Sequence, residues 1–242
     1  MVINKNPNSE LDSSIVHVPH LVQVPEDMLE FAQQFQEAMM MYTGAIREVK
    51  TKLEVLNDEL SVRNKRNPIE MIKSRIKKPM SIVEKLNRRG YPITLESMID
   101  NLHDVAGIRV ICSFVDDIYE VADMLVRQDD VRVIAIKDYI KNPKENGYRS
   151  YHMIIEIPVF FSEKKQPMRV EVQIRTIAMD FWASLDHQLK YKREFEGSDM
   201  ISKELKECAD VIAQTDMKML NIRKHIEDRG IEVRNPRQSS KL

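Results

Sequence analysis

Apolar side chains recur every three or four residues along residues 26–62, and no other feature constrains the fold of this chain as strongly. The recurring positions share helical spacing: Met28, Phe31, Phe35, Met39, Tyr42, Ile46, Val49, Leu53, Leu56 and Leu60. This periodicity predicts one long amphipathic helix. A second helical pattern covers residues 203–229. Each helix buries only one stripe, so we expect both to pack on other structure, and an oligomer would bury more of their surface.

Short apolar runs between these helices predict a sheet. We expect strands at 105–114, 131–137, 150–158 and 168–174, and extended chain at 73–77. We expect shorter helices at 79–89, 95–101, 117–128 and 176–191, and one or two helical turns from Ile69. Residues 143–147 read as a polar loop. This order predicts an α+β (or mixed α/β) single domain, in which a mixed β-sheet of about five strands is flanked by helices.

The ends of the chain are polar and interrupted by proline. We therefore expect a flexible N-terminus at 1–25, an N-terminal helix at 26–66, a central domain at 67–192, a C-terminal helical region at 193–229 and a disordered tail at 230–242. The two cysteines, Cys112 and Cys208, imply no disulfide framework, and no signal peptide or membrane span is visible. These features favour a cytoplasmic protein with no membrane partner.

Charge is balanced over the whole chain but not along it. Lys and Arg number 37 against 38 Asp and Glu, so bulk attraction to DNA or membranes is not indicated. No DNA partner is expected, and RNA binding stays open without a residue pattern in its favour. Residues 63–89, however, hold ten Lys or Arg and two acidic residues. A local basic stretch in a neutral protein suggests a focused anion site.

The basic stretch has the geometry of a phosphate site. If the chain is extended at Arg75 and Lys77, both side chains point to the same side. After Pro79, one helical face carries Ser81, Lys85 and Arg88. Cations beside the free N–H groups of a helix start would hold a triphosphate. The alternative is a solvated basic face, as most such runs are.

Asp104 and Arg109 flank the start of the first long apolar run. An aspartate at the mouth of a buried strand suits Mg²⁺, which prefers carboxylate oxygens. The alternative is a structural Asp104–Arg109 ion pair. The two residues are five apart and should face opposite sides of a strand, so a shared site would need a turn or bulge at 106–107. His103-Asp104 also mimics the metal-binding doublet of phosphohydrolases, but no upstream histidine pair completes it.

Two further segments carry polar groups in alternation. Tyr148, Ser150 and His152 share one face at a loop-to-strand junction, where a tyrosine can stack on a base; ordinary strand packing is the alternative. Glu171, Gln173 and Arg175 alternate with apolar residues on a later strand. A glutamate that faces Asp104 would supply a second metal carboxylate or accept a proton. An amphipathic edge strand would show the same alternation. The next helix has Asp180 in its first turn, and Trp182 is expected in the core.

Four motifs in this order resemble the synthetase domain of the RelA/SpoT family. They are Arg75-Ile-Lys-Lys with Ser81-Ile-Val-Glu-Lys85, His103-Asp-Val-Ala-Gly-Ile-Arg109, Asn146-Gly-Tyr-Arg-Ser-Tyr-His152 and Glu171-Val-Gln-Ile-Arg-Thr176. The resemblance spans about residues 67–191. Within this range the sequence is most similar to small alarmone synthetases of the RelP type. It implies a nucleotidyltransferase-like synthetase domain, usually in a homotetramer.

The resemblance also implies an activity. It predicts a GTP diphosphokinase that uses Mg²⁺ to transfer pyrophosphate from ATP to the ribose 3′-hydroxyl of GTP or GDP, making (p)ppGpp in the stringent response and releasing AMP. No hydrolase activity is expected, because the chain has little room for a hydrolase domain.

Site roles follow from the resemblance position by position. Asp104 and Glu171 match the metal and catalytic carboxylates; Arg75 and Arg109 match the arginines that sandwich adenine, with Arg109 also at the catalytic centre. The family residues that contact the ATP phosphates are matched here by Lys77, Ser81, Lys85 and Arg88. The family residues that bind GTP or GDP are matched by Tyr148, His152, Gln173, Arg175 and Asp180. Some relatives carry Asn at the position of Asp180, so this match is weaker.

Two other function classes fit the residues alone. A catalytically silent nucleotide- or RNA-binding module would use the basic stretch as its surface, although acids beside phosphates disfavour it. A nucleotidyltransferase would join a nucleotide to another acceptor and release pyrophosphate instead of AMP.

Overall fold

The computed structural model describes residues 26–64, 66–190 and 198–230. The expected flexible N-terminus and nearly all of the expected tail lie outside these residues. Elements follow in the order α1 (Glu26–Asn64), β1 (Ile69–Ile76), α2 (Pro79–Arg88), α3 (Leu95–Asn101), β2 (Ala106–Cys112), α4 (Val115–Val126), β3 (Arg132–Asp138), β4 (Tyr151–Phe160), β5 (Lys165–Thr176), α5 (Ile177–Lys190) and α6 (Ser198–Asp228).

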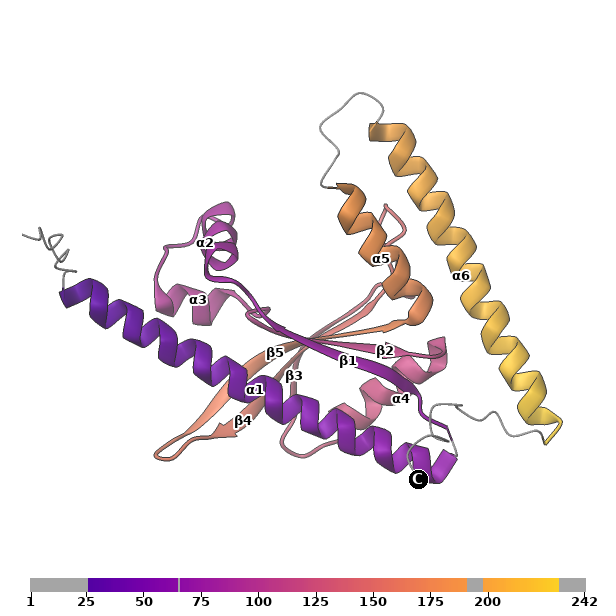
Figure 1. The fold of residues 1–242 in the computed structure, drawn as a ribbon, viewed down its shortest axis with the longest axis horizontal. Helices are drawn as coiled ribbons and strands as arrows, with labels where there is room; N and C mark the ends of the chain where they lie inside the picture. Colours follow the sequence, from indigo (N-terminus) through magenta and orange to yellow (C-terminus); the bar gives the residue numbers. More distant parts are fainter. Residues whose placement is uncertain (1–25, 65, 191–197, 231–242) are drawn as a thin grey trace, which may run out of the picture.

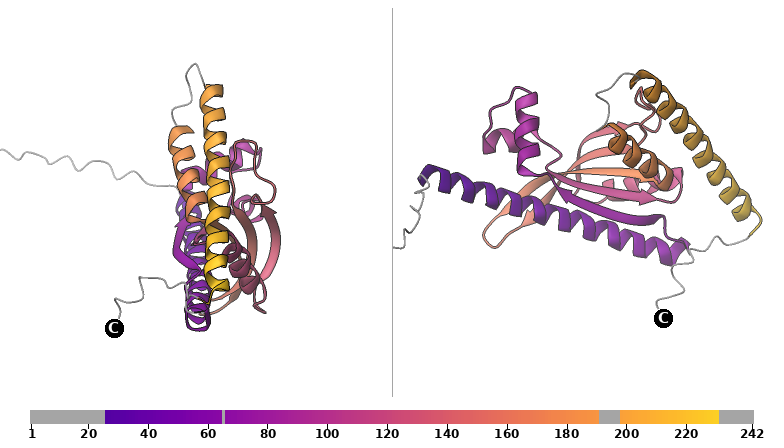
Figure 2. Two further views of the ribbon diagram at one scale, coloured as in Figure 1. Left: turned by 90° about the vertical axis from the view of Figure 1, so that its right-hand side faces the viewer. Right: turned by 45° about the horizontal axis from the view of Figure 1, so that its top comes forward.

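The five strands form one mixed sheet in the order β1-β2-β5-β4-β3. Strands β2 and β5 run parallel, and the other neighbouring strands run antiparallel. Helices α2 and α3 lie at one end of the sheet, and α5 and α6 lie at the other (Figures 1 and 2). The prediction of an α+β fold with a mixed sheet and long terminal helices is confirmed.

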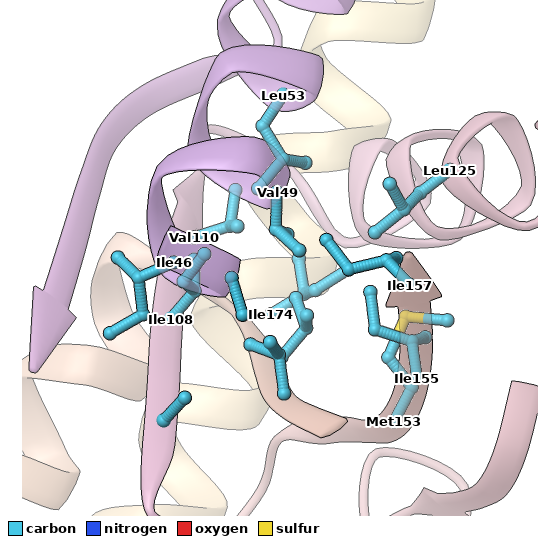
Figure 3. Close-up of a cluster of buried hydrophobic side chains, with 14 of the residues drawn as sticks. Ile46, Val49, Leu53, Ile108, Val110, Leu125, Met153, Ile155, Ile157 and Ile174 are labelled. Atoms are coloured by element: carbon cyan, nitrogen blue, oxygen red, sulfur yellow. The ribbon is translucent and has the colours of Figure 1, made fainter. Parts of the chain in front are cut away.

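Helices α1 and α4 cover one face of this sheet and form the core with it. In Figure 3, Val49 and Leu53 of α1 point toward strand residues such as Ile174, and Leu125 of α4 closes the other side. The strands supply alternate side chains, as expected for a sheet with one buried face. In β2 and β5 the even-numbered residues are buried there, including Ile108 and Val172. Their odd-numbered neighbours therefore face the opposite side.

The expected helical turn from Ile69 is wrong. Ile69–Ile76 forms edge strand β1, which pairs antiparallel with β2 and carries an irregularity between Ile69 and Met71. A short apolar run fits a helix or a strand equally well by local pattern. Pairing with a distant segment decides the outcome here, because context overrides local preference in sheets. The expected extended chain at 73–77 agrees with β1.

A buried ion-pair cluster anchors α6 to the start of α4. The Asp117 side chain is 0% exposed and accepts hydrogen bonds from Arg66, after α1, and from Arg223 of α6. Arg223 also pairs with Asp116, and its guanidinium lies 4.8 Å from the centre of the Phe114 ring. A buried carboxylate requires such partners. The cluster therefore ties three segments that are far apart in sequence.

Helix α6 also runs beside α5 (Figure 2). The buried indole of Trp182 in α5 donates its Nε1–H to the carbonyl oxygen of Leu205 in α6, at 2.9 Å. This contact confirms the expectation that Trp182 belongs to the interior.

The buried side chain of Tyr42 makes the free energy of unfolding depend on pH in the alkaline range. Burial raises the pKa of Tyr42 from 10.0 to about 12. The unfolded chain ionises first, so this stabilisation is present below pH 10 and is lost as the pH rises towards 12; the loss is about 2–3 kcal/mol. We expect Tyr42→Phe to flatten the decline in unfolding free energy between pH 9 and 11.5, measured by urea denaturation. An unchanged decline would contradict this assignment.

Candidate functional site

The open face of the sheet carries a row of polar side chains across all five strands. Residues in register along this row are Lys73, Arg109, Gln173, His152 and Lys137. The next row includes Arg75, Gly107 and Glu171. Two residues predicted for ATP and three predicted for the acceptor or for catalysis therefore occupy neighbouring strands. The expected common face of Glu171, Gln173 and Arg175 is confirmed by their hydrogen bonds to one another.

Gly107 leaves space between Arg75 and Glu171. A Cβ atom at Gly107 would lie 3.6 Å from Cγ of Arg75, which is ordinary contact. The cavity beside it has a volume of about 270 Å³ and is also lined by Arg109 and Gln173. The pairing of β2 is regular with β1 at residue 106 and with β5 through residues 107–112, so the bulge that a shared site would have needed at 106–107 is not formed.

Asp104 precedes β2, in a bent segment where strand alternation does not apply. Its Oδ2 lies 2.6 Å from Nζ of Lys85 and 3.0 Å from Nζ of Lys77. Burial disfavours the charged form, but the hydrogen bonds from Lys85 and Lys77 outweigh it and lower the pKa of Asp104 below 3.8. Asp104 is therefore ionised at neutral pH. Two predicted phosphate residues and a predicted metal ligand meet at this point.

The alternative of an Asp104–Arg109 ion pair is wrong. Nη1 of Arg109 instead lies 3.2 Å from Oδ1 of Asp180, which also accepts a hydrogen bond from Arg175 at 3.2 Å. Asp180 lies in the first turn of α5 as predicted, and its second oxygen lies 3.6 Å from Nζ of Lys73. Asp180 thus connects an arginine predicted for adenine to the residues predicted for the acceptor.

Glu171 lies at the centre of the cleft. Burial raises its pKa, but hydrogen bonds from His152 and Gln173 outweigh burial and keep the pKa of Glu171 below 4.5, despite repulsion from Asp104. Gln173 donates to Oε2 at 2.9 Å, and Nδ1 of His152 lies 3.5 Å from Oε1. Both Glu171 and Asp104 line a cavity of about 310 Å³. The carboxylate is therefore ionised and able to accept a proton.

Arg175 completes a ring of hydrogen-bonded side chains that includes Glu171. It is 4% exposed and donates to the side chains of Tyr148, Ser150, Gln173 and Asp180. The oxygen of Tyr148 accepts from Arg175, so its O–H can donate to Nε2 of His152, 2.8 Å away. With Nε2 acting as an acceptor, the proton of the neutral imidazole lies on Nδ1, which faces Glu171. Arg175 was predicted to bind the acceptor, and its guanidinium here holds protein groups in place.

Tyr139 and Lys144 also belong to this region, and sequence reasoning missed them. The Tyr139 ring lies edge-on to Tyr148 and to His152, at centroid distances of 6.0 and 5.3 Å. Nζ of Lys144 lies 4.8 Å from the centre of the Tyr139 ring and 5.0 Å from that of Tyr148. Lys144 lines both the 310 Å³ cavity and a neighbouring cavity of about 600 Å³ beside Tyr148. A polar loop gave no sign that its lysine covers two aromatic rings.

Helix α2 contributes unevenly to the site. Lys85 reaches Asp104, and Ser81 lies one turn earlier and is half-buried. Arg88 is exposed, and its neighbour Arg89 lines the 310 Å³ cavity together with His103. Nδ1 of His103 lies 3.3 Å from Nη1 of Arg169.

Two carboxylates fit a divalent cation that is shared with a bound nucleotide. The described residues hold no cluster of three or more His, Cys, Asp or Glu side chains that would bind a metal alone. Oδ1 of Asp104, however, is buried and has no hydrogen-bond partner. Mg²⁺ usually takes one or two protein carboxylates and completes its shell with water and phosphates. Within the described residues, no helix has the length and apolar character to span a membrane.

Comparison with known proteins agrees with this geometry. Residues 74–196 match the family described as a region found in RelA / SpoT proteins. The chain is 42% identical to GTP pyrophosphokinase YwaC of Bacillus subtilis over 217 residues, which cover 90% of this chain and 100% of the relative.

Solved structures agree as well. Small alarmone synthetase 2 of Bacillus subtilis is 43% identical, with a TM-score of 0.72 over 79% of this chain and 99% of that one. Small alarmone synthetase 1 of the same species, bound to its product pppGpp, is 34% identical, with a TM-score of 0.74 over 81% and 99% of the two chains. This chain therefore belongs to the RelA/SpoT family and is a small alarmone synthetase.

Proposed function

We propose that this chain is a GTP pyrophosphokinase that transfers the pyrophosphate of ATP to the 3′-hydroxyl of GTP or GDP and releases AMP. The ionised Glu171 beside Asp104, in a cleft lined by arginines, lysines and aromatic rings, carries this proposal. Similarity to a GTP pyrophosphokinase over its whole length, and to a synthetase bound to pppGpp, supports the choice of guanosine nucleotide and product. Its assignment to the RelP type stays a prediction.

The ATP side of the cleft has arginines from two neighbouring strands. In this proposal Arg75 and Arg109 hold adenine above Gly107, and flat guanidinium groups suit such stacking. Lys77 and Lys85, now paired with Asp104, turn to the phosphates, assisted by Ser81 and Arg88. Cations here would stabilise the charge that develops on the transferred group.

The acceptor side is centred on Tyr148. In this proposal the base stacks on the Tyr148 ring, and His152 and Gln173 position the ribose and phosphates. The carboxylate of Asp180 can accept from the N1–H and N2–H groups of guanine, although Arg109 and Arg175 now occupy one of its oxygens. Guanine would then compete with these arginines for Asp180.

Mg²⁺ is the metal that these residues would hold, through Oδ1 of Asp104 and the carboxylate of Glu171. When bound, it would neutralise charge on the ATP phosphates. Glu171 would accept the proton of the attacking 3′-hydroxyl, since it is ionised and lies beside His152. Positioned proton transfer of this kind contributes about 10²–10⁴-fold to rate. Lys77 and Lys85 would keep the phosphates in place during the transfer, and Arg109 would hold ATP at the same centre.

A homotetramer in the cytoplasm completes the proposal. Exposed apolar side chains on α6, such as Val211 and Met219, support burial against a further copy of the chain. Sedimentation of the purified protein would show whether four chains associate.

Product identification tests the function directly. Purified protein would be incubated with Mg²⁺, γ-labelled ATP and GTP or GDP, and the products separated by chromatography. We expect label in (p)ppGpp together with unlabelled AMP. Labelled pyrophosphate would favour the nucleotidyltransferase alternative, and binding without turnover would favour a silent module.

Glu171→Gln tests the proton acceptor. The amide keeps the size of the side chain but cannot take a proton, so we expect synthesis to fall by about 10²–10⁴-fold while ATP binding persists. Turnover and the equilibrium binding of ATP would be measured in parallel. The control is Glu163→Gln, at the exposed turn between β4 and β5. Near-normal turnover of Glu171→Gln would remove Glu171 from this role.

Gly107→Val tests the place of adenine. The added methyl groups would fill the space beside Arg75, so we expect the KM for ATP to rise by about tenfold or more. Strand structure should tolerate valine, and the thermal midpoint would check this. Gly107→Ala is the graded control, because its Cβ meets only ordinary contacts. An unchanged KM for ATP in Gly107→Val would place adenine elsewhere.

Tyr148→Ala tests stacking on the acceptor base. Stacking is worth roughly 1–3 kcal/mol per base, so the KM for GTP or GDP should rise by about tenfold to a hundredfold. Tyr148→Phe keeps the ring and loses only the hydroxyl that meets Arg175 and His152. Tyr91→Ala, on an exposed turn, is the control. Equal effects of Ala and Phe at position 148 would assign the role to the hydroxyl and contradict stacking.

A further inference from the structure

Helix α6 lies behind the acceptor side of the cleft and contacts both segments that build it. One segment is the loop that leads through Gly147 and Tyr148 into β4, and the other is the junction of β5 with α5 at Thr176. The catalytic roles proposed above use no residue of α6. These contacts therefore raise the question of what α6 does for the reaction.

Asp216 of α6 meets the β5–α5 junction through a buried hydrogen bond. Its side chain is 8% exposed, and Oδ2 accepts from Oγ1 of Thr176 at 2.8 Å. Oγ1 of Thr176 in turn accepts from the backbone N–H of Met179, at 3.1 Å, and so caps the first turn of α5. That turn carries Asp180. Asp216 is thus two hydrogen bonds away from the turn that presents Asp180 to the cleft.

The same carboxylate lies beside the acceptor loop. Nη1 of Arg149 lies 4.0 Å from Oδ2 of Asp216, and this nitrogen is buried without a hydrogen-bond partner. Arg149 stands between Tyr148 and Ser150, both of which accept from Arg175 on the opposite side of the chain. Asp216 supplies the charge that a buried guanidinium needs. Asp216 is therefore the charged partner of the residue that directly follows Tyr148.

The loop backbone also packs directly against α6. Gly147 has a φ of +84°, and a Cβ placed there would lie only 2.4 Å from Cβ of Ala209. The loop can approach α6 this closely only because residue 147 has no side chain. Loop and helix are therefore in van der Waals contact one residue before Tyr148.

We propose that Asp216 is a positioning residue for the acceptor site, which sets the positions of Tyr148 and Asp180 through Arg149 and Thr176 without touching either substrate. This inference rests on the proposed placement of GTP or GDP beside Tyr148. Burial raises the pKa of Asp216, although Thr176 and Arg149 favour its charged form. A carboxylate kept at such a desolvation cost suggests a role beyond packing.

Steady-state kinetics of α6 variants test the proposal. Asp216→Ala removes both contacts, so we expect the KM for GTP or GDP to rise by about tenfold or more, with the KM for ATP within about twofold of wild type. Asp216→Asn keeps an oxygen for Thr176 and loses the charge beside Arg149, so its effect should be smaller. This variant is nearly isosteric and serves if Asp216→Ala does not fold.

The matched control is Glu207→Gln, another acid-to-amide change on an exposed position of α6. It should leave both KM values unchanged. An acceptor KM within about twofold of wild type in folded Asp216 variants would overturn the proposal. A parallel rise in both KM values would also overturn it, because general loosening of the fold affects the two substrates alike.

A double-mutant cycle adds a readout that a purely structural role would not produce. Thr176→Val and Asp216→Ala should raise the acceptor KM by less in combination than the product of their separate effects, since both remove the same hydrogen bond. Independent effects would contradict the route through Thr176. Wild-type synthesis of (p)ppGpp in the same assay checks the proposed function separately, so unchanged variants would count against the inference alone.

Discussion

The buried guanidinium of Arg175 holds the acceptor side of the cleft together. With 4% of its surface exposed, it donates to side chains from the loop before β4, from β5 itself and from the first turn of α5. A buried cation is stable only when its donors are satisfied, so these segments cannot move independently. Tyr148, Gln173 and Asp180 consequently stand at fixed distances from Glu171, and the order of the cleft depends on one side chain that is itself almost hidden.

Periodicity predicted most elements because their patterns are local. The stripe along α1 and the alternation in β5 can both be recognised from a few neighbouring residues. The prediction for Ile69–Ile76 failed because a short apolar run suits a helix and a strand alike. Only its pairing with β2 decides between them. The absent bulge at Gly107 has a related cause. Asp104 lies before the strand begins, and where a strand begins depends on distant hydrogen bonds.

Residue chemistry identified the carboxylates of the site but not their partners. Asp104 and Glu171 were recognisable because acids beside apolar strands are costly and need a purpose. The sequence did not reveal that Asp104 pairs with Lys77 and Lys85, since these contacts depend on where the start of α2 lies relative to the segment before β2. Lys144 was unpredictable for the same reason, because a lysine in a polar loop usually points into water. The ordered family motifs supplied the nucleotide and the reaction, which spacing alone could not.

The hydrogen bond from Trp182 to Leu205 has a practical consequence. The chain contains a single tryptophan, and its indole lies at the contact between α5 and α6. Its fluorescence therefore reports on one place only, the joint between the helix that carries Asp180 and the helix that carries Asp216. A change in emission when a guanosine nucleotide binds would be a label-free optical signal of the acceptor site, available in the unmodified enzyme.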